Sequence, residues 1–443
     1  MNERRVRAEL ESVLREALAA VAPRRAVQRV VSRWGDDLQI DGRPLPASVR
    51  LRVVAVGKAA AAMAAEIEGV AGDRIAWGLA LTKDGHGVPL SHCELRESGH
   101  PVPDARGVAA AGEILARVIE APAAEPLLVL LSGGASALAT CPLPGLSLDE
   151  LARTTSLLLE SGAPIDELNA VRKHLTALSG GRLAAAAPAR RIEVLAISDV
   201  VGDRLDVIGS GPCAPDPSTF ADALAVLDRR ALRASVPPAV LRHLESGERG
   251  AIPETPKPGD PIFERVHTSV IASNHTALEA ARCAASDLGL RPLVVSESLQ
   301  GEARDAGRRL AALARSLRVR EATCLLVGGE TAVHVRGNGR GGRNQELVLA
   351  AALELRGTKG ISLLAAGTDG TDGPTDAAGA YADGETVSRG EAAGVDPAGA
   401  LAENDAYTFF DREGGLLRTG PTRTNVMDLV LVRIDPSSRS PVG

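Results

Sequence analysis

The chain is expected to form two α/β domains, of which the first is a doubly wound domain with a parallel sheet. Short apolar runs of strand length recur along the sequence and alternate with stretches of helical spacing. The runs are continuously apolar, which is typical of parallel strands covered on both faces. A segment rich in Pro and Gly, 247–261 (GERGAIPETPKPGDP), interrupts this pattern. It predicts a linker between the two domains.

The first domain is predicted to span residues 1–246. It begins with an amphipathic helix, whose apolar residues recur at helical spacing from Val6 until Pro23 ends it. The predicted strands share an apolar run followed by a polar or glycine-rich turn, and they lie at 51–56, 76–81, 127–131 and 193–197. Helices are predicted between them at 59–67, 105–120, 147–161 and 165–185.

After the linker the alternation starts again, which predicts a smaller C-terminal α/β domain over residues 262–443. Its strands are expected at 268–272, 292–295, 324–327, 332–336, 361–366 and 428–434. Its helices are expected at 275–289, 302–317 and 344–355.

Composition excludes several classes of protein. The 45% of hydrophobic and 24% of charged residues are typical of a folded chain rather than a disordered one. A net charge of −6 and 2% aromatic residues disfavour a nucleic-acid partner. The five cysteines contain no C-x-x-C pair, and the start MNERRVRAEL has no apolar leader. A cytoplasmic protein without a membrane partner is therefore expected, and a homodimer is left open.

The turns that follow the predicted strands are the candidate sites, because ligands of open parallel sheets bind beyond the carboxyl ends of the strands. Lys58 follows strand 51–56 at a helix start, a place where a bound anion would offset its charge. The turn Ser132, Gly133 and Gly134 follows strand 127–131, and its backbone N–H groups are expected to cradle phosphate. A solvated lysine and a turn without ligand are the alternatives.

Two further features of the first domain point to anion or metal chemistry. Asn169, Arg172 and Lys173 are spaced to share one face of a helix, which suits a bound anion; an ordinary exposed face is the alternative. Asp199 follows strand 193–197, where a carboxylate suits Mg²⁺, although Asp also forms turns without a metal.

The second domain contributes a glycine-rich loop and an aspartate-rich turn. Gly337, Gly339 and Gly342 match G-x-G-x-x-G, but no acidic residue follows at the spacing of a dinucleotide site. Three aspartates follow strand 361–366 within eight residues: Asp369, Asp372 and Asp376. Cations, phosphate cradles and aspartates together are the groups that phosphoryl transfer needs.

Several stretches, in order along nearly the whole chain, resemble glycerate 2-kinases of the MOFRL family. Among them are VVAVGKAA, LLSGGASAL, ISDVVGD, GGETAVHVRGNGRGGRNQE, AAGTDGTDGPTDAAGA and GPTRTNVMDLVLV. The resemblance implies a Rossmann-like domain, a smaller domain and an active site in the cleft between them. It also implies phosphorylation of D-glycerate to 2-phospho-D-glycerate with ATP and Mg²⁺.

Matching motif by motif, the resemblance implies pocket positions for Lys58, Glu330, Arg343, Asp369 and Asn425. Our hypothesis is that Lys58 and Arg343 stabilise charge on the transferred phosphoryl group while Asp369 orients or deprotonates the glycerate hydroxyl. Asp199 and Asp372 are the expected Mg²⁺ ligands. Because members of this family are often labelled hydroxypyruvate reductase, an NAD(P)H-dependent reductase is the alternative enzyme. A module that only senses a small anion is the alternative without catalysis.

Overall fold

The structure, a computed structural model, describes residues 3–436 and divides into two compact units. The central unit comprises Pro23–Ile271, and the terminal unit comprises Met1–Ala22 together with Ala272–Gly443. Each unit contains one six-stranded sheet, so two α/β folds are confirmed.

The sheet of the central unit has the strand order of the Rossmann fold. Its strands, in spatial order, are β6 (Glu94–Ser98), β5 (Ile75–Lys83), β4 (Leu51–Val56), β7 (Leu127–Leu131), β8 (Ile192–Ile197) and β9 (Val266–Ala272). Numbered along the chain, this order is 3-2-1-4-5-6. The registers of β6 with β5, β5 with β4, β4 with β7 and β7 with β8 are parallel. The predicted doubly wound domain is therefore confirmed.

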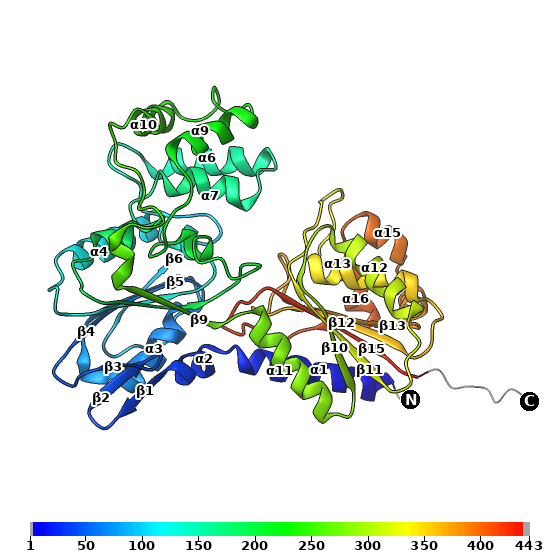
Figure 1. Cartoon of the computed structure of the whole chain (residues 1–443). Helices are drawn as coiled ribbons and strands as arrows, with labels where there is room; N and C mark the ends of the chain where they lie inside the picture. The colour runs from blue at the N-terminus through cyan, green and yellow to red at the C-terminus, as the bar shows by residue number, and fades with distance from the viewer. Residues whose placement is uncertain (1–2, 437–443) are drawn as a thin grey trace, which may run out of the picture. The chain divides into compact units, whose positions relative to one another are not determined.

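Helices cover this sheet, and a further group of helices has a core of its own. The sheet carries α3 (Ala60–Ala71), α4 (Ala105–Ile119), the short α5 (Ala135–Leu138) and α8 (Arg182–Ala186). The separate group consists of α6 (Leu148–Glu160), α7 (Ile165–Lys173), α9 (Phe220–Arg229) and α10 (Pro238–Glu248), as Figure 1 shows. The helix predicted at 165–185 forms as two separate helices: α7 ends at Lys173, and α8 begins after Gly180 and Gly181, which both adopt positive φ angles.

A small antiparallel sheet precedes β4 and was not predicted. It consists of β1 (Val31–Trp34), β2 (Asp37–Ile40) and β3 (Arg43–Leu45), and it follows α2 (Pro23–Val30). These strands have only three or four residues and carry polar side chains, so the local apolar pattern is weak.

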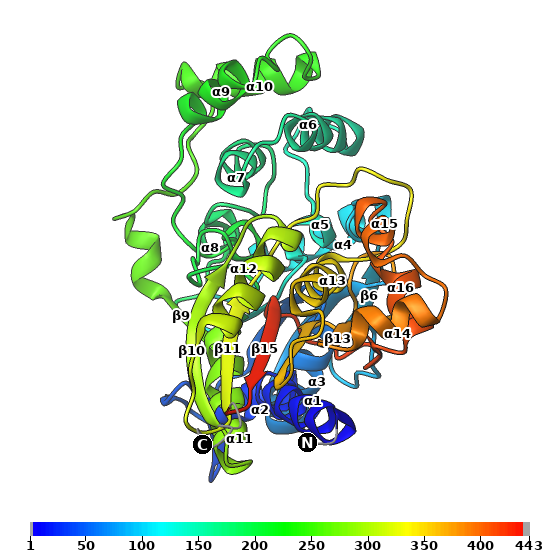
Figure 2. The same ribbon diagram turned by 90° about the vertical axis from the view of Figure 1, so that its right-hand side faces the viewer.

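The sheet of the terminal unit is mixed. In spatial order its strands are β10 (Arg291–Leu299), β11 (Thr323–Gly329), β15 (Asp428–Ile434), β12 (Ile361–Gly367), β13 (Gly379–Asp383) and β14 (Leu416–Leu417). β15, the last strand of the chain, runs antiparallel to both β11 and β12 (Figure 2). The two strands that flank β15 are therefore parallel to each other, and their carboxyl ends meet the start of β15.

Helices lie on both faces of this second sheet. They are α1 (Glu3–Ala20), α11 (Asn274–Asp287), α12 (Ala303–Ser316), α13 (Arg343–Leu355), α14 (Thr386–Ala392), α15 (Pro397–Ala402) and α16 (Ala406–Glu413). α12 packs on α13, and α1 packs on α11 on the other side of the sheet (Figure 1). The buried side chains of β11, β12 and β15 alternate between the two faces, so this sheet too is covered on both sides.

The observed units differ from the predicted boundaries at 246 and 262. The first helix, α1, packs in the terminal unit, because its apolar face is buried against α11. β9 completes the sheet of the central unit instead of starting the second domain. The expected linker 247–261 lies within the central unit, where Glu254 contacts His174 and Thr255 donates to Asp216. A segment that is rich in Pro and Gly can pack tightly when its polar side chains find such partners.

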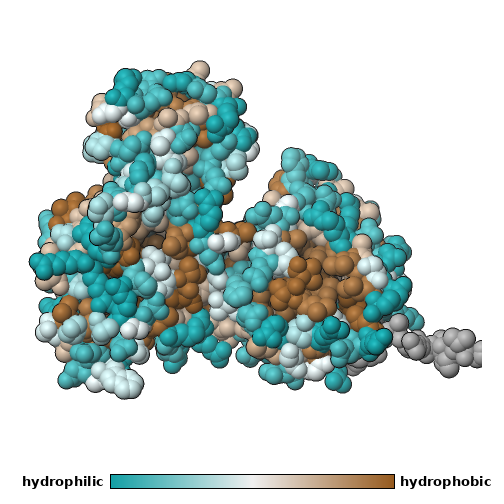
Figure 3. Space-filling model, in the orientation of Figure 1, coloured by the Kyte–Doolittle hydropathy of each residue, from teal (hydrophilic) through white to brown (hydrophobic). Residues whose placement is uncertain are grey.

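Two surface features complete the fold. The predicted strand at 332–336 does not form beyond one bridge between Ala332 and Glu302, and Val335 is 73% exposed. β10 is an edge strand with three neighbouring exposed apolar residues, Leu293, Val294 and Val295, and Figure 3 shows an apolar patch over this part of the terminal unit. Within residues 3–436, no helix has the length and apolar character needed to span a membrane.

Candidate functional site

Two of the predicted turns meet where the strand order of the central sheet reverses. Lys58 follows β4 and Ser132 follows β7, and these two strands are parallel neighbours. The backbone N–H of Lys58 donates to the Gly133 carbonyl at 2.9 Å, and the N–H of Ala59 donates to Ser132 Oγ at 3.0 Å. The crevice beyond such a reversal is the usual ligand position in this fold. The structure therefore brings Lys58 and the Ser132–Gly134 turn together at that position.

Glycines allow this close approach. Gly57 has a φ of 130°, and a Cβ there would collide with Ser132. Gly134 has a φ of 86°, and a Cβ there would lie 3.4 Å from Lys58 Cγ and 3.0 Å from the His100 ring. The Lys58 side chain thus lies over Gly134, beside His100. Ser132 is itself buried and uses its hydroxyl to hold the two turns together.

A row of polar side chains leads from this turn to α7. Ser136 Oγ lies 2.7 Å from Ser210 Oγ. The Ser210 hydroxyl lies 3.0 Å from Asn169 Oδ1, and Arg172 Nη2 donates to both Asn169 Oδ1 at 3.0 Å and Ser210 Oγ at 3.3 Å. Burial lowers the pKa of Arg172. Among residues 3–436 no carboxylate pairs with this guanidinium, so its charge is available to a bound anion.

Lys173, the neighbour of Arg172, does not join this face. Its side chain is 3% exposed, and Nζ lies 3.2 Å from Asp216 Oδ1 and 3.4 Å from Asp206 Oδ2. Burial acts to raise the pKa of Asp216, but Lys173 and hydrogen bonds from Ser218 outweigh it and lower that pKa. The charge of Lys173 is therefore balanced inside the central unit. Helical spacing alone did not distinguish this lysine from Arg172.

The second group of predicted residues gathers at one edge of the terminal sheet. Glu330 follows β11, Asp369 follows β12, and Asn425 lies three residues before β15 begins. Arg343 is the first residue of α13, whose start lies at the same edge. Because β11 and β12 run opposite to β15, their carboxyl ends and the start of β15 coincide there. The structure thus brings these four residues to one edge.

Arg343 is held by two carboxylates. Its Nε lies 2.6 Å from Asp428 Oδ2 and its Nη2 lies 2.9 Å from Asp428 Oδ1, while Nη1 lies 2.9 Å from Glu330 Oε1. Burial lowers the pKa of Arg343, but the ion pair with Asp428 outweighs it and raises that pKa. Burial also raises the pKa of Asp428, even though Arg343 acts against it. We did not single out Asp428 from the sequence, although an aspartate that begins an apolar strand was a usable signal.

The two predicted aspartates of the 366–376 turn have different surroundings. Asp369 is half-buried, and its Oδ1 accepts hydrogen bonds from the N–H and hydroxyl of Thr371, each at 3.0 Å. Asp372 is 2% exposed and caps α13, because its two oxygens accept the N–H groups of Asn344 at 3.0 Å and Gln345 at 2.8 Å. Burial raises the pKa of Asp372 to about 6. Its carboxylate is thus engaged by the helix start.

The two expected magnesium ligands, Asp199 and Asp372, belong to different units. Asp199 is half-buried two residues after β8, whereas Asp372 lies in the terminal unit. In the part of the chain that the structure describes, no group of three or more His, Cys, Asp or Glu side chains is placed to hold a metal ion.

The G-x-G-x-x-G loop packs against the protein itself. A Cβ at Gly337, Gly339 or Gly342 would collide with Glu403, Asp405 or Asp372, respectively. The N–H groups of residues 336 and 337 donate to Asn404 Oδ1 at 2.7 and 3.1 Å. Close internal packing explains these glycines. The G-x-G-x-x-G match therefore no longer supports a dinucleotide-dependent reductase.

The predicted residues therefore form two groups, one in each unit. The central unit holds Lys58, Ser132, Gly133, Gly134, Asn169, Arg172, Lys173 and Asp199, and the terminal unit holds Glu330, Arg343, Asp369, Asp372 and Asn425. The expectation that both groups serve one cleft stays a prediction. Sequence reasoning missed Asp428, Ser210 and His100, which lie against the predicted residues from distant parts of the chain.

Comparisons with known proteins cover nearly the whole chain. Residues 9–245 match a family described as a domain of unknown function, DUF4147, and residues 323–428 match the MOFRL family. A D-glycerate 2-kinase of Thermotoga maritima is 42% identical over 95% of this chain and 96% of its own length. A crystal structure of a glycerate kinase from the same organism aligns with a TM-score of 0.84 and 40% identity, covering 98% of this chain and 100% of that one. A protein of Agrobacterium vitis named as a putative hydroxypyruvate reductase is 41% identical over 87% of each chain.

Proposed function

The chain belongs to the MOFRL family of glycerate 2-kinases, and on that premise we propose how its own residues phosphorylate D-glycerate to 2-phospho-D-glycerate with ATP. The observation that carries the proposal is the position of Lys58 over the Gly133–Gly134 turn at the reversal of the central sheet. A compact cation beside backbone N–H groups suits the phosphates of a nucleotide.

In the central unit, Lys58 offsets the negative charge of the transferred phosphoryl group. The N–H groups of Gly133 and Gly134 hold phosphate oxygens, since the N–H of Ser132 donates to the Val56 carbonyl and its hydroxyl accepts from Ala59. Arg172 and Asn169 supply a further polar group for an anion. Lys173 acts indirectly, because its ion pairs with Asp216 and Asp206 fix α7 and thereby the position of Arg172.

In the terminal unit, Arg343 stabilises phosphoryl charge through the part of its guanidinium that now contacts Glu330. Asp428 keeps the guanidinium plane fixed, and the more exposed Glu330 yields its place to a phosphoryl oxygen. Asp369 accepts the proton of the glycerate 2-hydroxyl or orients that hydroxyl for attack. Asn425 lies in the loop at the same edge and donates a hydrogen bond to the substrate.

Magnesium is proposed to bind together with ATP rather than in a preformed cage. Mg²⁺ commonly takes one or two carboxylates, several waters and substrate phosphates, and there it neutralises phosphate charge. Asp199, at a strand end of the central unit, fits that donor set. Asp372 fits less well, because both of its oxygens accept hydrogen bonds from the start of α13.

The deciding experiment supplies the purified protein with D-glycerate and Mg-ATP and identifies the product by ³¹P NMR. We expect ATP-dependent formation of the 2-phosphate ester. A parallel assay follows NADH oxidation with hydroxypyruvate. Reductase turnover without any ATP-dependent product would overturn the proposed function.

Two further proposals concern the surroundings of the enzyme. All five cysteines are free, which suits the reducing cytoplasm, where ATP is also abundant.

The exposed apolar edge strand β10 suits antiparallel pairing with β10 of a second copy, which would form a homodimer. Light scattering should then report a dimer in the wild type and a monomer in Val294→Lys; a wild-type monomer would contradict this pairing.

A further inference from the structure

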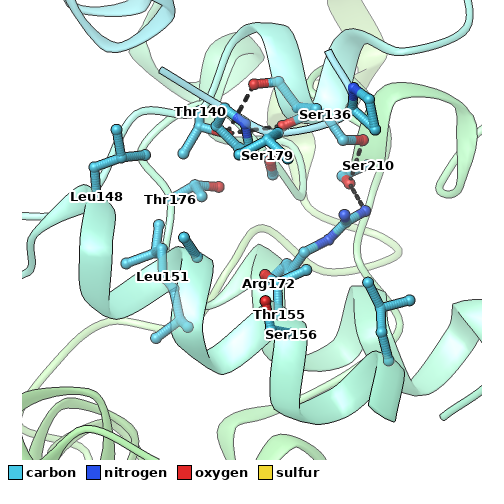
Figure 4. A pocket seen from close by; sticks show the side chains of 17 residues that line it. Ser136, Thr140, Leu148, Leu151, Thr155, Ser156, Arg172, Thr176, Ser179 and Ser210 are labelled. Atoms are coloured by element: carbon cyan, nitrogen blue, oxygen red, sulfur yellow. Dashed lines mark hydrogen bonds between the residues drawn. The ribbon is translucent and has the colours of Figure 1, made fainter. Parts of the chain in front are cut away.

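A cavity of about 210 Å³ lies in the central unit, beside the Ser132–Gly134 turn. Its lining comes from the loop after β6, from α5, α6 and α7, from the segment between α7 and α8, and from Ser210 (Figure 4). Every residue of the lining belongs to the central unit.

One end of the cavity is polar and has unused hydrogen-bonding capacity. Arg172 Nε and Thr176 Oγ1 are buried and have no hydrogen-bond partner within the described chain. Thr176 is only 7% exposed, and both side chains line the cavity. Buried polar groups normally find partners, and a positive charge without a carboxylate is costlier still. This end is therefore built for an anionic or hydrogen-bonding ligand.

The rest of the lining is largely apolar. Leu148, Leu151 and Leu159 of α6 line the cavity together with Val102 and its flanking prolines, and Leu159 and Val102 are 59% and 70% exposed. D-Glycerate has only seven heavy atoms, four of them oxygens, and no apolar surface to place against such a wall. A flat heterocycle matches it better, because ligand pockets combine apolar walls with a few directed polar groups. The Thr155 and Ser156 hydroxyls offer hydrogen bonds to such a ring.

We propose that this cavity holds the adenine and ribose of ATP, with the phosphates at the Arg172 end; this inference rests on the proposed kinase function. The row from Arg172 through Ser210 to Ser136 ends next to the Ser132–Gly134 turn. A triphosphate along that row passes from the planar guanidinium, which binds phosphate with two donors, toward Lys58. The adenosine part of the nucleotide is thereby bound by the central unit alone.

The test compares ligands that have and lack the adenosine part. Ser156→Trp places a bulky ring in the cavity from an exposed position of α6, so the fold is preserved. Calorimetric titration should show ADP binding weakened about tenfold or more, which corresponds to at least 1.4 kcal/mol. Binding of inorganic tripolyphosphate should stay unchanged in this variant. Arg172→Met should weaken the binding of both ADP and tripolyphosphate.

The matched control is Arg153→Trp, which adds the same ring at an exposed position of α6 outside the cavity lining. It should bind ADP as the wild type does. In steady-state assays Ser156→Trp should raise the KM for ATP and leave the KM for glycerate within about twofold. A raised KM for glycerate with unchanged ADP binding would overturn the inference, and so would wild-type values for both ligands. Wild-type turnover with glycerate is measured separately, so loss of the proposed function is distinguished from loss of this subsite.

Discussion

Arg343 and Asp428 form a two-pronged ion pair at the start of β15, with Nε–Oδ2 and Nη2–Oδ1 separations of 2.6 and 2.9 Å. Asp428 is opposite Gly329 of β11 and Gly367 of β12, so no side chain from either neighbouring strand residue crowds the pair. The ion pair fixes the guanidinium plane and directs Nη1 toward Glu330. The position of Arg343 thus depends on a carboxylate 85 residues away.

We therefore expect Asp428→Asn to weaken both catalysis and stability. The amide keeps the shape but removes the charge that holds Arg343, so kcat should fall about 10–100-fold. Breaking a buried pair should also cost about 3–5 kcal/mol of unfolding free energy, measured by urea denaturation. Asp376→Asn is the control, because Asp376 pairs with Arg418 on the surface and should change neither quantity appreciably. A normal kcat in a destabilised Asp428→Asn would limit Asp428 to a structural role.

Replacement of Lys58 tests the central unit in the same way. Lys58→Met keeps the length of the side chain and removes its charge, and kcat/KM should fall about 10²–10⁴-fold, as for other lost transition-state donors. Lys58→Arg should retain more activity than the methionine variant, because the charge remains. Lys359→Met, an exposed lysine of the terminal unit, should behave as the wild type. Equal activity in Lys58→Met and Lys359→Met would remove Lys58 from the mechanism.

The contact between the β4 and β7 turns gives a third prediction. In Gly57→Ala the new Cβ collides with Ser132, and the φ of 130° is unfavourable for alanine, so unfolding free energy should drop by about 3 kcal/mol or more. Gly85→Ala is the matched control. Gly85 also has a positive φ, but nothing lies within 4 Å of its Cβ position, so about 1 kcal/mol is expected. Similar losses from both variants would show that backbone strain, rather than the contact with Ser132, decides the effect.

The strands were predictable where burial leaves a local mark. β4, β7, β8, β11, β12 and β15 are apolar along nearly their whole length, so each carries its own signal. β6 (ELRES) was not predicted. It lies at the edge of the sheet and has only one buried residue, so its sequence has no apolar pattern. The segment 332–336 was predicted as a strand because of its β-branched residues, but it pairs with no strand beyond a single bridge. Which unit α1 and β9 join depends on distant packing, which no local pattern records.

The candidate site shows the same division. Lys58, Ser132 and Asp369 were found because the fold places strand-end turns at the ligand-binding edge. What each side chain contacts was not predictable. Helical spacing put Arg172 and Lys173 on one face, yet Asp216, 43 residues farther along the chain, balances only the lysine. Asp372 caps α13, because the chain returns to the start of that helix 28 residues after Asn344.

The two capping aspartates Asp372 and Asp104 should give opposite pH dependences of stability. Burial raises the pKa of Asp372 to about 6, from an ordinary value of 3.8. The folded state therefore holds this proton more tightly, and the stability contributed by Asp372 falls as the pH rises from about 4 to about 6, by on the order of 3 kcal/mol. Burial acts to raise the pKa of Asp104 as well, but hydrogen bonds from Gly107 and Arg106 outweigh it and lower that pKa. Its contribution is present above pH 4 and is lost as the pH falls.

This difference is checked by urea denaturation at about pH 3.5 to about pH 7, a range that covers the pKa values of both aspartates. The proteins compared are the wild type, Asp372→Asn and Asp104→Asn. The advantage of the wild type over Asp372→Asn should shrink as the pH rises, whereas its advantage over Asp104→Asn should grow. Both variants replace a carboxylate that accepts N–H groups at a helix start, so the lost hydrogen bonds are similar and the slope reports burial. Parallel slopes of the same sign would mean that Asp372 is ionised in the folded state at low pH, and its carboxylate would then be available to a cation after all.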